Sequence, residues 1–148
     1  MVDNIKIQVI NKSNNELPKI ETIGSAGLDI RAFIEEDIIL QPSKYCLVST
    51  GLYFSIPIGY ECQIRSRSGM AFKNGVIVLN SPGTIDSDYR GEIKVILMNL
   101  SDESFIIHNG DRIAQMVFSK YYIPEYEEVD ILPNSDRGNN GFGSTGQN

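Results

Sequence analysis

Apolar and polar residues alternate with a period of two in several short segments of this chain. The apolar positions of these segments are Ile5, Ile7 and Val9; Tyr60, Cys62 and Ile64; Ile93, Val95 and Leu97; and Ile113 and Val117. Such alternation is typical of β-strands that bury one face. Because turn residues such as Pro57, Gly59 and Gly110 separate the segments, we expect an all-β domain of the sandwich, barrel or jelly-roll type.

Two local patterns add detail to this expectation. Residues Ser68–Asn74 can form a short helix, and Gly75 is placed to end it. Further on, the apolar run 76–79 leads into a turn, and the chain returns through the strand pattern 92–97. This arrangement predicts a hairpin that carries the segment 80–91.

The end of the chain differs in kind from the rest. Residues 134–148 contain four glycines and a single apolar side chain, Phe142. Such a segment buries too little to order itself. We therefore expect one β domain over residues 1–133 and a flexible C-terminal arm over residues 134–148. A frayed terminus is the simplest interpretation of this composition. A frayed terminus, however, would not need the particular order of residues 137–146, RGNNGFGSTG.

Length, cysteine count and charge exclude several classes of protein. The 148 residues correspond to one domain, and no apolar stretch approaches the roughly 20 residues of a membrane span. No signal-peptide pattern opens the chain, and Cys46 and Cys62 are expected to be free thiols in a reducing cytoplasm. The net charge of −6 argues against non-specific binding of nucleic acid. A phosphate ligand would need a few well-placed arginines and backbone N–H groups.

Two segments in the first half of the chain are candidates for a binding site. Asp29 lies between apolar neighbours, so it needs a partner if it is buried, although a turn aspartate is equally compatible with the pattern. Ser68 and Gly69 follow Arg67 at the expected helix start. They offer a hydroxyl, free N–H groups and positive charge to an anion. The alternative is a solvated basic turn with a serine cap.

Two further segments follow in the second half. The segment 80–91 contains Asp86, Asp88 and Tyr89, and its exposed backbone could bind the edge of a planar base. An Asx-rich loop is the alternative, although it does not account for the Tyr89-Arg90-Gly91 ending. Gln115 shares the phase of Ile113 and Val117, so we expect it to be buried and hydrogen-bonded, either in a site or as a structural residue.

The fifth candidate segment is the C-terminal arm itself. Arg137 can hold a phosphate through two parallel hydrogen bonds. The backbone N–H groups of Gly143, Ser144 and Thr145 can surround phosphate oxygens. Phe142 can stack on a base.

Taken in this order, the five segments resemble the five motifs of the trimeric, all-β dUTPase family almost from end to end. The matching runs are Ala26-Gly27-Leu28-Asp29, Arg67-Ser68-Gly69, residues 85–91 (IDSDYRG), residues 110–115 (GDRIAQ) and residues 137–146 (RGNNGFGSTG). The third and fifth are highly specific. Ser66 stands where many members have proline, and Ser81-Pro82 replaces a more apolar pair.

The resemblance implies a distorted jelly-roll fold and the hydrolysis of dUTP to dUMP and pyrophosphate by attack of water on the α-phosphate. This reaction keeps uracil out of DNA and supplies dUMP for thymidylate synthesis. By the same resemblance, Asp86 is the catalytic residue that activates the water, a role suited to a carboxylate that is ionised at neutral pH. Asp88 is then a structural neighbour rather than a second base.

The resemblance also implies how each part of dUTP is bound. Tyr89 stacks on the deoxyribose and excludes a 2′-hydroxyl, and the hairpin matches the hydrogen-bonding edge of uracil. The implied substrate-binding residues are Asn80, Gly83, Thr84, Ile85 and Tyr89 for the nucleoside, Arg67, Ser68, Gly69 and Gln115 for the phosphates, and Arg137, Phe142, Gly143, Ser144 and Thr145 from the arm. Asp29 supports the site.

Finally, the family implies Mg²⁺ as cofactor and a homotrimer with active sites shared between subunits. The ion is held by substrate phosphates and water, with no direct protein ligand, which is usual for Mg²⁺. The nearest enzymatic alternative is dCTP deaminase, which has a similar fold but needs an acid–base glutamate and has no need of this arm. A nucleotide-sensing or protein-binding module and a purely structural β-trimer are the alternatives without catalysis.

Overall fold

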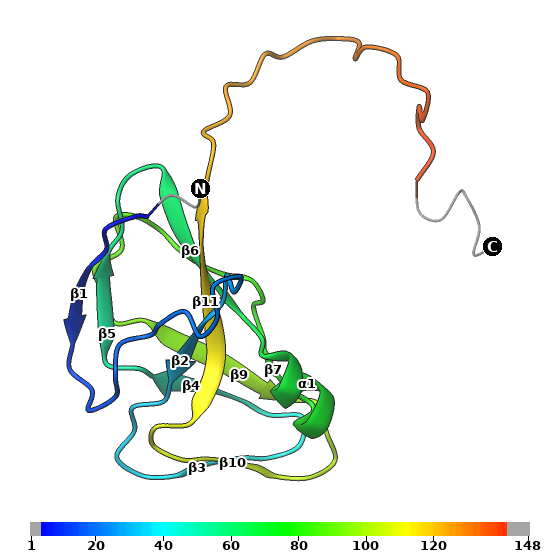
Figure 1. The fold of residues 1–148 in the computed structure, drawn as a ribbon. Coiled ribbons are helices and arrows are strands. Elements are labelled where there is room, and N and C mark those ends of the chain that lie inside the picture. The colour runs from blue at the N-terminus through cyan, green and yellow to red at the C-terminus, as the bar shows by residue number, and fades with distance from the viewer. Residues whose placement is uncertain (1–3, 142–148) are drawn as a thin grey trace.

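Eleven strands and one helix form the regular structure of residues 4–141, which are the residues that this computed structural model describes (Figure 1). The strands are β1 (Gln8–Asn11), β2 (Leu28–Arg31), β3 (Ile38–Leu40), β4 (Tyr45–Ser49), β5 (Leu52–Ser55), β6 (Tyr60–Arg65), β7 (Val76–Val78), β8 (Gly83–Ile85), β9 (Lys94–Asn99), β10 (Phe105–Ile107) and β11 (Arg112–Lys120), and helix α1 covers Ser68–Asn74. The predicted all-β fold with one short helix is confirmed.

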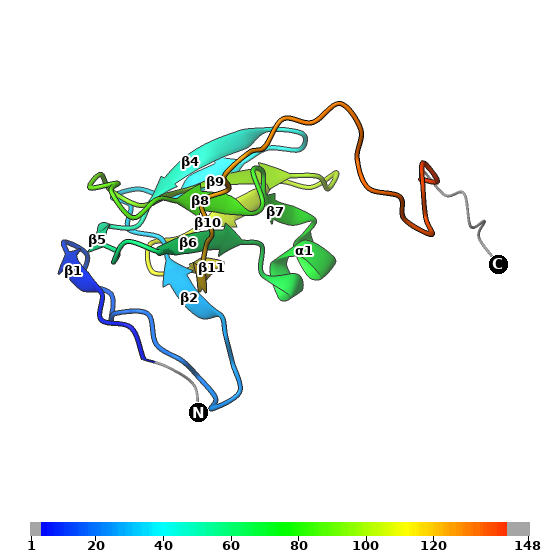
Figure 2. The ribbon, with the colours of Figure 1, turned by 90° about the horizontal axis from the view of Figure 1, so that it is seen from above.

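The strands form four open, antiparallel sheets. The largest has the order β2-β11-β6-β8, and a second has the order β4-β9-β7. Two smaller sheets pair β1 with β5 and β3 with β10. Figure 2 shows β4 and β9 on one side of β6, β11 and β2, which belong to the four-stranded sheet. Strands distant in sequence are neighbours throughout, as expected for a distorted jelly roll.

The core lies between the two larger sheets, and alternate residues of their strands fill it. Cys62 and Ile64 face inward from β6, and Val95 and Leu97 face inward from β9, each at most 2% exposed. These are the positions predicted from the period-two pattern. Each such aliphatic side chain stabilises the fold by about 1.5–3 kcal/mol through burial.

Helix α1 has the predicted bounds. Gly75 follows its last residue with φ of 65°, and the Gly75 N–H donates to the Ala71 carbonyl. This left-handed conformation suits glycine and stops the helix. At the other end, Arg67 precedes the helix and no side chain caps the first turn, so α1 places its first N–H groups beside Arg67.

Two strand predictions need correction. The strand expected from Ile5 begins only at Gln8, and its Val9 and Ile10 are exposed because β1 pairs with β5 alone, at the margin of the fold. In β11, the register shifts between Arg112 and Ala114.

This register shift changes which residues of β11 are buried. Beyond it, Ala114 and Met116 are buried, whereas Gln115 and Val117 are half-buried on the opposite face. The prediction that Gln115 shares the buried phase of Ile113 is therefore wrong, since an extra residue in a strand inverts the alternation.

The predicted hairpin is present but is more complex than a single turn. β7 pairs with β9 through Val78 opposite Leu97, as expected. The connecting segment, however, contains β8, which leaves that sheet and pairs with β6, placing Gly83 opposite Ile64 and Ile85 opposite Cys62. The segment 80–91 thus bridges the two large sheets.

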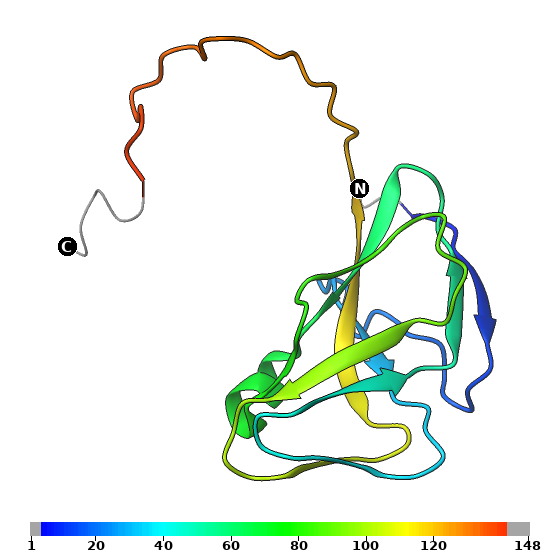
Figure 3. The same cartoon turned by 180° about the vertical axis from the view of Figure 1, so that it is seen from behind.

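Beyond β11 the described chain contains no helix or strand. Residues 122–140 are exposed, and the segment arches away from the sheets, as Figures 1 and 3 show. The predicted division of the chain at residue 133 stays a prediction. No helix of the described residues is long and apolar enough to cross a membrane.

Candidate active site

An ion cluster joins the first, second and fourth candidate segments. Asp29 on β2 accepts a hydrogen bond from Arg67 Nε (2.9 Å) and one from Arg112 Nη1 (3.1 Å). Arg67 Nη1 also donates to the Arg112 carbonyl (3.1 Å). Asp29 and Arg67 are each about a quarter exposed. Asp29 therefore has the partner that its surroundings require, and Arg67 is held in place with donors to spare, because a guanidinium carries five N–H groups.

Gln115 lies beside this cluster on β11. Its Nε2 donates to the carbonyl of Ser66 (2.9 Å), so the expected hydrogen bond exists although the side chain is only half-buried. Gly27 leaves room for the Gln115 amide, since a Cβ at Gly27 would overlap Gln115 Oε1. Ser68 and Gly69, both exposed, begin helix α1 next to these residues.

Asp86 lies in a separate depression of about 270 Å³. The residues that line it are Leu47, Thr84, Ile85, Asp86, Tyr89, Glu92 and Lys94. Asp86 and Asp88 are both exposed, but only Asp86 lines the depression. The structure thus brings Asp86, Tyr89, Thr84 and Ile85 together in one depression.

The loop that carries Asp86 and Tyr89 is held by its own hydrogen bonds. The Tyr89 N–H donates to the Asp86 carbonyl (3.2 Å), and the Tyr89 hydroxyl donates to the Glu92 carbonyl (3.0 Å). Arg90 Nη1 donates to the carbonyls of Ser87 (2.7 Å) and Tyr89 (2.9 Å). A Cβ at Gly91 would overlap the Tyr89 ring, so glycine is required for the ring to fold back over this loop.

The remaining hairpin residues flank β8. Gly83 is buried and Thr84 is exposed, and they lie opposite Ile64 and Gln63 of β6. Asn80 approaches Gly83 across the turn, where a Cβ at Gly83 would lie 3.0 Å from the Asn80 amide nitrogen. The side chain of Asn80 is thereby placed at the entrance of β8.

Within one chain, Asp86 and Arg67 lie at opposite ends of β6. Ile85 pairs with Cys62 near the start of β6, whereas Arg67 lies two residues beyond Arg65, the last residue of this strand. At about 3.3 Å per residue, this path separates the two residues by roughly 20 Å. One chain therefore does not bring the carboxylate of Asp86 to the ion cluster.

Glu92 and Lys94 are site residues that the sequence did not indicate. Glu92 Oε1 accepts from the Gly51 N–H (3.0 Å), and Glu92 Oε2 lies 3.5 Å from Lys94 Nζ. Because these partners fix Glu92, Asp86 is the carboxylate of the depression that is open to solvent. Arg112, the second cation at Asp29, was also not singled out. Arg112 belongs to the GDRIAQ run, three residues before Gln115, and this position could have indicated it as a site residue.

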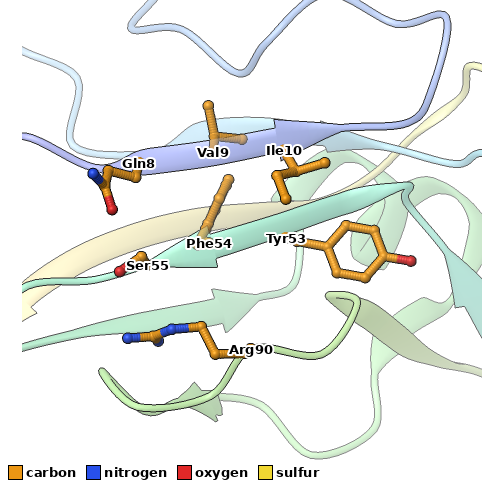
Figure 4. A pocket seen from close by; sticks show the side chains of 7 residues that line it. All are labelled: Gln8, Val9, Ile10, Tyr53, Phe54, Ser55 and Arg90. Carbon is orange, nitrogen blue, oxygen red and sulfur yellow. The ribbon is translucent and has the colours of Figure 1, made fainter.

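A larger cavity of about 380 Å³ lies between β1 and β5 and beside Arg90. Figure 4 shows its lining, which is formed mainly by Val9, Ile10, Tyr53 and Phe54. It shares no residue with the Asp86 depression. The polar side chains of its lining are Gln8, Ser55 and Arg90, together with the Tyr53 hydroxyl.

Comparisons with known proteins connect this geometry to a family. The family model for dUTPase matches residues 4–146. The chain belongs to the dUTPase family. A deoxyuridine 5′-triphosphate nucleotidohydrolase from Finegoldia magna is 55% identical over 142 residues, which cover 96% of this chain and 99% of that protein. The enzyme of the same name from Cytophaga hutchinsonii is 55% identical over 141 residues, 95% of this chain and 92% of that one.

Solved dUTPase structures have the same fold. A mutant dUTPase of Staphylococcus bacteriophage 80alpha, solved with dUpNHpp, superposes with a TM-score of 0.83 at 27% identity, covering 97% of this chain and 99% of that chain. A dUTPase of phage phi11, solved to show the coordination of a structural Mg(II) ion, gives a TM-score of 0.76 at 24% identity, covering 86% and 99%. At 24% identity, the match to the phage phi11 structure shows only that the two chains have the same fold.

The activity of this dUTPase is the hydrolysis of dUTP. Burial in the core, with Glu61 nearby, raises the pKa of the Cys62 thiol to about 12. Burial also raises the pKa of Cys46.

Within one chain, the described residues do not bring the C-terminal arm to the rest of the predicted dUTPase site. Arg137 is exposed, and among the described residues its side chain donates only to the Asn140 carbonyl (2.8 Å). Phe142, Gly143, Ser144 and Thr145 lie outside the described residues. No group of three His, Cys, Asp or Glu side chains within residues 4–141 is arranged to hold a metal ion.

Proposed function

We propose that Asp86 activates the water that attacks the α-phosphate of dUTP, releasing dUMP and pyrophosphate. The observation that carries the proposal is the position of Asp86 and Tyr89 together in one depression. A carboxylate open to solvent can orient a water molecule and accept its proton as the new P–O bond forms. The bond to the leaving pyrophosphate then breaks, and the product dUMP keeps the water oxygen.

Tyr89 selects deoxyribose in this proposal. Its ring is anchored through its hydroxyl to the Glu92 carbonyl and lies against Gly91. A ring fixed at both ends cannot move aside for a 2′-hydroxyl, so UTP is rejected by a steric clash. The same anchoring keeps the sugar beside Asp86.

The residues Asn80, Gly83, Thr84 and Ile85 read the base. Backbone groups of the hairpin can pair with O4 and N3–H of uracil, and cytosine presents the opposite donor and acceptor pattern. A buried polar group left without a partner makes such discrimination strong. The β7–β9 and β6–β8 pairings hold the two ends of this segment, which favours a rigid reading edge.

The ion cluster and helix α1 bind the phosphates. Asp29 holds Arg67 and Arg112 in place, and the N–H groups that remain on Arg67 can grip phosphate oxygens. The Ser68 hydroxyl, the Gly69 N–H and Gln115 complete this set. Asp29 is thus a positioning residue rather than a ligand, because its oxygens are already engaged.

Mg²⁺ accompanies the substrate in this proposal. The described residues provide no protein cage for the ion, and Mg²⁺ usually binds through substrate phosphates and water. An ion that arrives on the triphosphate needs only open space near Asp86 and the phosphate-binding residues. When bound, it would offset the charge of the phosphates in a protein of net charge −6.

The active site forms between subunits of a homotrimer. The separation of roughly 20 Å along β6 between Asp86 and Arg67 supports this arrangement, because the depression of one chain needs phosphate ligands from another. The outer face of β4-β9-β7 also supports it. On that face two β4–β9 pairs are apolar, Leu47 opposite Ile96 and Tyr45 opposite Met98, and the third pair, Ser49 opposite Lys94, is polar. Tyr45 and Leu47 are more than half exposed. Contiguous apolar surface of this kind marks association sites.

The C-terminal segment contributes to the same assembly. Tyr122, Ile123 and Tyr126 are at least 79% exposed in the isolated chain, although large apolar side chains favour burial. A segment that leaves its own domain is free to reach another subunit. Its continuation would carry Arg137, Phe142, Gly143, Ser144 and Thr145 over the phosphates and base of a neighbouring site. The free thiols Cys46 and Cys62 are compatible with a reducing cytoplasm.

Hydrolysis in water labelled with heavy oxygen tests the proposed chemistry. Attack on the α-phosphate places the label in dUMP and none in pyrophosphate, as mass spectrometry of the two products will show. Label in pyrophosphate instead would contradict attack on the α-phosphate. Tyr89→Phe, which retains Asp86 and the aromatic ring, serves as a control that should give the same label distribution.

A further inference from the structure

Ser66 lies where three parts of the dUTPase site meet. It follows β6 and precedes Arg67 and helix α1, and it is half-buried. Its side chain and its backbone carbonyl each accept a hydrogen bond from a different segment. Neither segment is adjacent to Ser66 in the sequence.

The first of these bonds holds the start of the hairpin. Ser66 Oγ accepts a hydrogen bond from the Val78 N–H (2.9 Å). β7 is an edge strand of the β4-β9-β7 sheet, so an N–H that points away from β9 has no strand to pair with. The hydroxyl of Ser66 supplies that acceptor two residues before Asn80, where the hairpin leaves the sheet.

The second bond holds the phosphate-binding side. The Ser66 carbonyl accepts from Gln115 Nε2 (2.9 Å), and the Gln115 amide oxygen lies against the backbone of Gly27. The next residue, Arg67, is fixed by Asp29 (2.9 Å). The backbone of Ser66 is therefore clamped, and its hydroxyl transmits that fixed position to β7.

We propose that Ser66 is a positioning residue that sets the placement of the uracil-reading hairpin relative to the phosphate-binding segment. The inference rests on the proposed roles of Asn80 and Gln115. In a trimer with shared sites, the two segments of one chain serve neighbouring sites, so one hydroxyl contributes to both. A residue without a side-chain acceptor at position 66 could not bind the Val78 N–H in this way.

Steady-state kinetics of Ser66→Ala with dUTP and dCTP tests the proposal. Loss of one hydrogen bond should raise KM for dUTP about threefold to tenfold and lower the preference for dUTP over dCTP in kcat/KM by a similar factor. The value of kcat for dUTP should stay within about twofold, because Asp86 is untouched. Ser66→Thr keeps the hydroxyl and should restore both quantities.

Ser104→Ala is the matched control, since it also removes a serine hydroxyl with one side-chain partner, Gln41 Oε1 (2.8 Å), but outside both segments. It should leave KM and the nucleotide preference unchanged. The proposal is overturned if Ser66→Ala has the wild-type KM for dUTP and the wild-type preference for dUTP over dCTP. It is also overturned if the variant lowers kcat equally for every nucleotide while KM is unchanged, because that result indicates a loss of folded protein. Wild-type turnover of dUTP in the same assay tests the proposed function separately.

Discussion

Two side chains of the site owe their positions to glycines beside them. The amide of Gln115 occupies space that a side chain at Gly27 would fill, and the ring of Tyr89 occupies space beside Gly91. Neither Gly27 nor Gly91 has a positive φ. Glycine is therefore needed at these positions because a side chain would clash, and not because of the backbone conformation. Gly27 and Gly91 are therefore as much part of the site as the side chains they admit.

Asp86→Asn should abolish the base while preserving the shape of the depression. We expect kcat for dUTP to fall by about 10²- to 10⁴-fold, the usual effect of removing a positioned general base. Binding of a non-hydrolysable dUTP analogue, measured by calorimetry, should change little. Asp88→Asn is the control, because Asp88 does not line the depression, and it should retain near-normal turnover. Near-normal turnover of Asp86→Asn itself would assign the catalysis to another residue.

Tyr89→Ala should relax the rejection of UTP more than the rejection of dTTP. The reason is that the ring is proposed to face the sugar and not C5 of the base. Comparing kcat/KM for dUTP, UTP and dTTP measures both effects. Tyr89→Phe keeps the ring and should keep most of the selectivity against UTP. Equal relaxation towards UTP and dTTP would mean that the ring is not a sugar gate.

At the scale of elements, periodicity and capping predicted helix α1 and the strands β6, β7, β9 and β11, but not β2, β3, β4, β5, β8 or β10. The alternation around Cys62, Ile64, Val95 and Leu97 identifies buried strand positions because a strand inverts its facing at every residue. The bulge in β11 could not be predicted in this way. A single extra residue leaves no signature in composition, yet it moves Gln115 to the other face.

The position of β8 was also not predictable from the alternation. The segment 83–85 has only three residues, and turn residues flank it, so no period of two can be recognised. Its pairing with β6 depends on a contact between residues about twenty positions apart. Local patterns describe strands, whereas partners are chosen by the packing of the whole domain.

Gly75→Ala should destabilise the protein by about 1 kcal/mol or more. Gly75 has φ of 65°, and a Cβ there would lie 3.1 Å from the backbone nitrogen and the Cβ of Ser101, so alanine is both strained and crowded. Chemical denaturation followed by circular dichroism measures the loss. Gly24→Ala is the control, because a Cβ at Gly24 meets nothing within 4 Å, and its effect should be below about 0.5 kcal/mol. Equal stabilities of the two variants would contradict the assigned role of Gly75 as the helix stop.

At the scale of the whole molecule, the structure divides the candidate site residues of one chain into two separate groups. The chain brings Asp86 to Tyr89 and Arg67 to Asp29, yet it leaves these two groups at opposite ends of β6. No linear pattern encodes that separation, which arises from the antiparallel pairing of β6 and β8. In the proposed function, this separation is the reason for a site that is shared between chains.

Mixed trimers should therefore recover activity from two inactive chains. Asp86→Asn chains supply a good arm and tail-deleted chains supply a good Asp86. After co-refolding, some composite sites will contain both, and dUTP turnover should return in part. Each variant refolded alone is the control and should stay inactive. A monomer in light scattering of the wild type would contradict the shared site directly.

Truncation after Pro133 should leave folding and assembly intact while nearly abolishing turnover. The removed residues, of which 134–140 are exposed, contribute no helix or strand within the described part. Ordering them over a substrate costs roughly 1 kcal/mol per residue, so their contacts are most useful where charge builds in the transition state. Light scattering and the unfolding transition should match the full chain. Normal dUTP hydrolysis by the truncated enzyme would reduce the arm to a frayed end.

The most direct test of the central claim measures pyrophosphate release by the purified wild-type protein from dUTP, dTTP, dCTP and UTP, each with Mg²⁺, together with ammonia release from dCTP. The account predicts rapid pyrophosphate release from dUTP, far slower release from the other three, and no ammonia. Ammonia from dCTP, or similar rates of pyrophosphate release from dUTP and UTP, would contradict it.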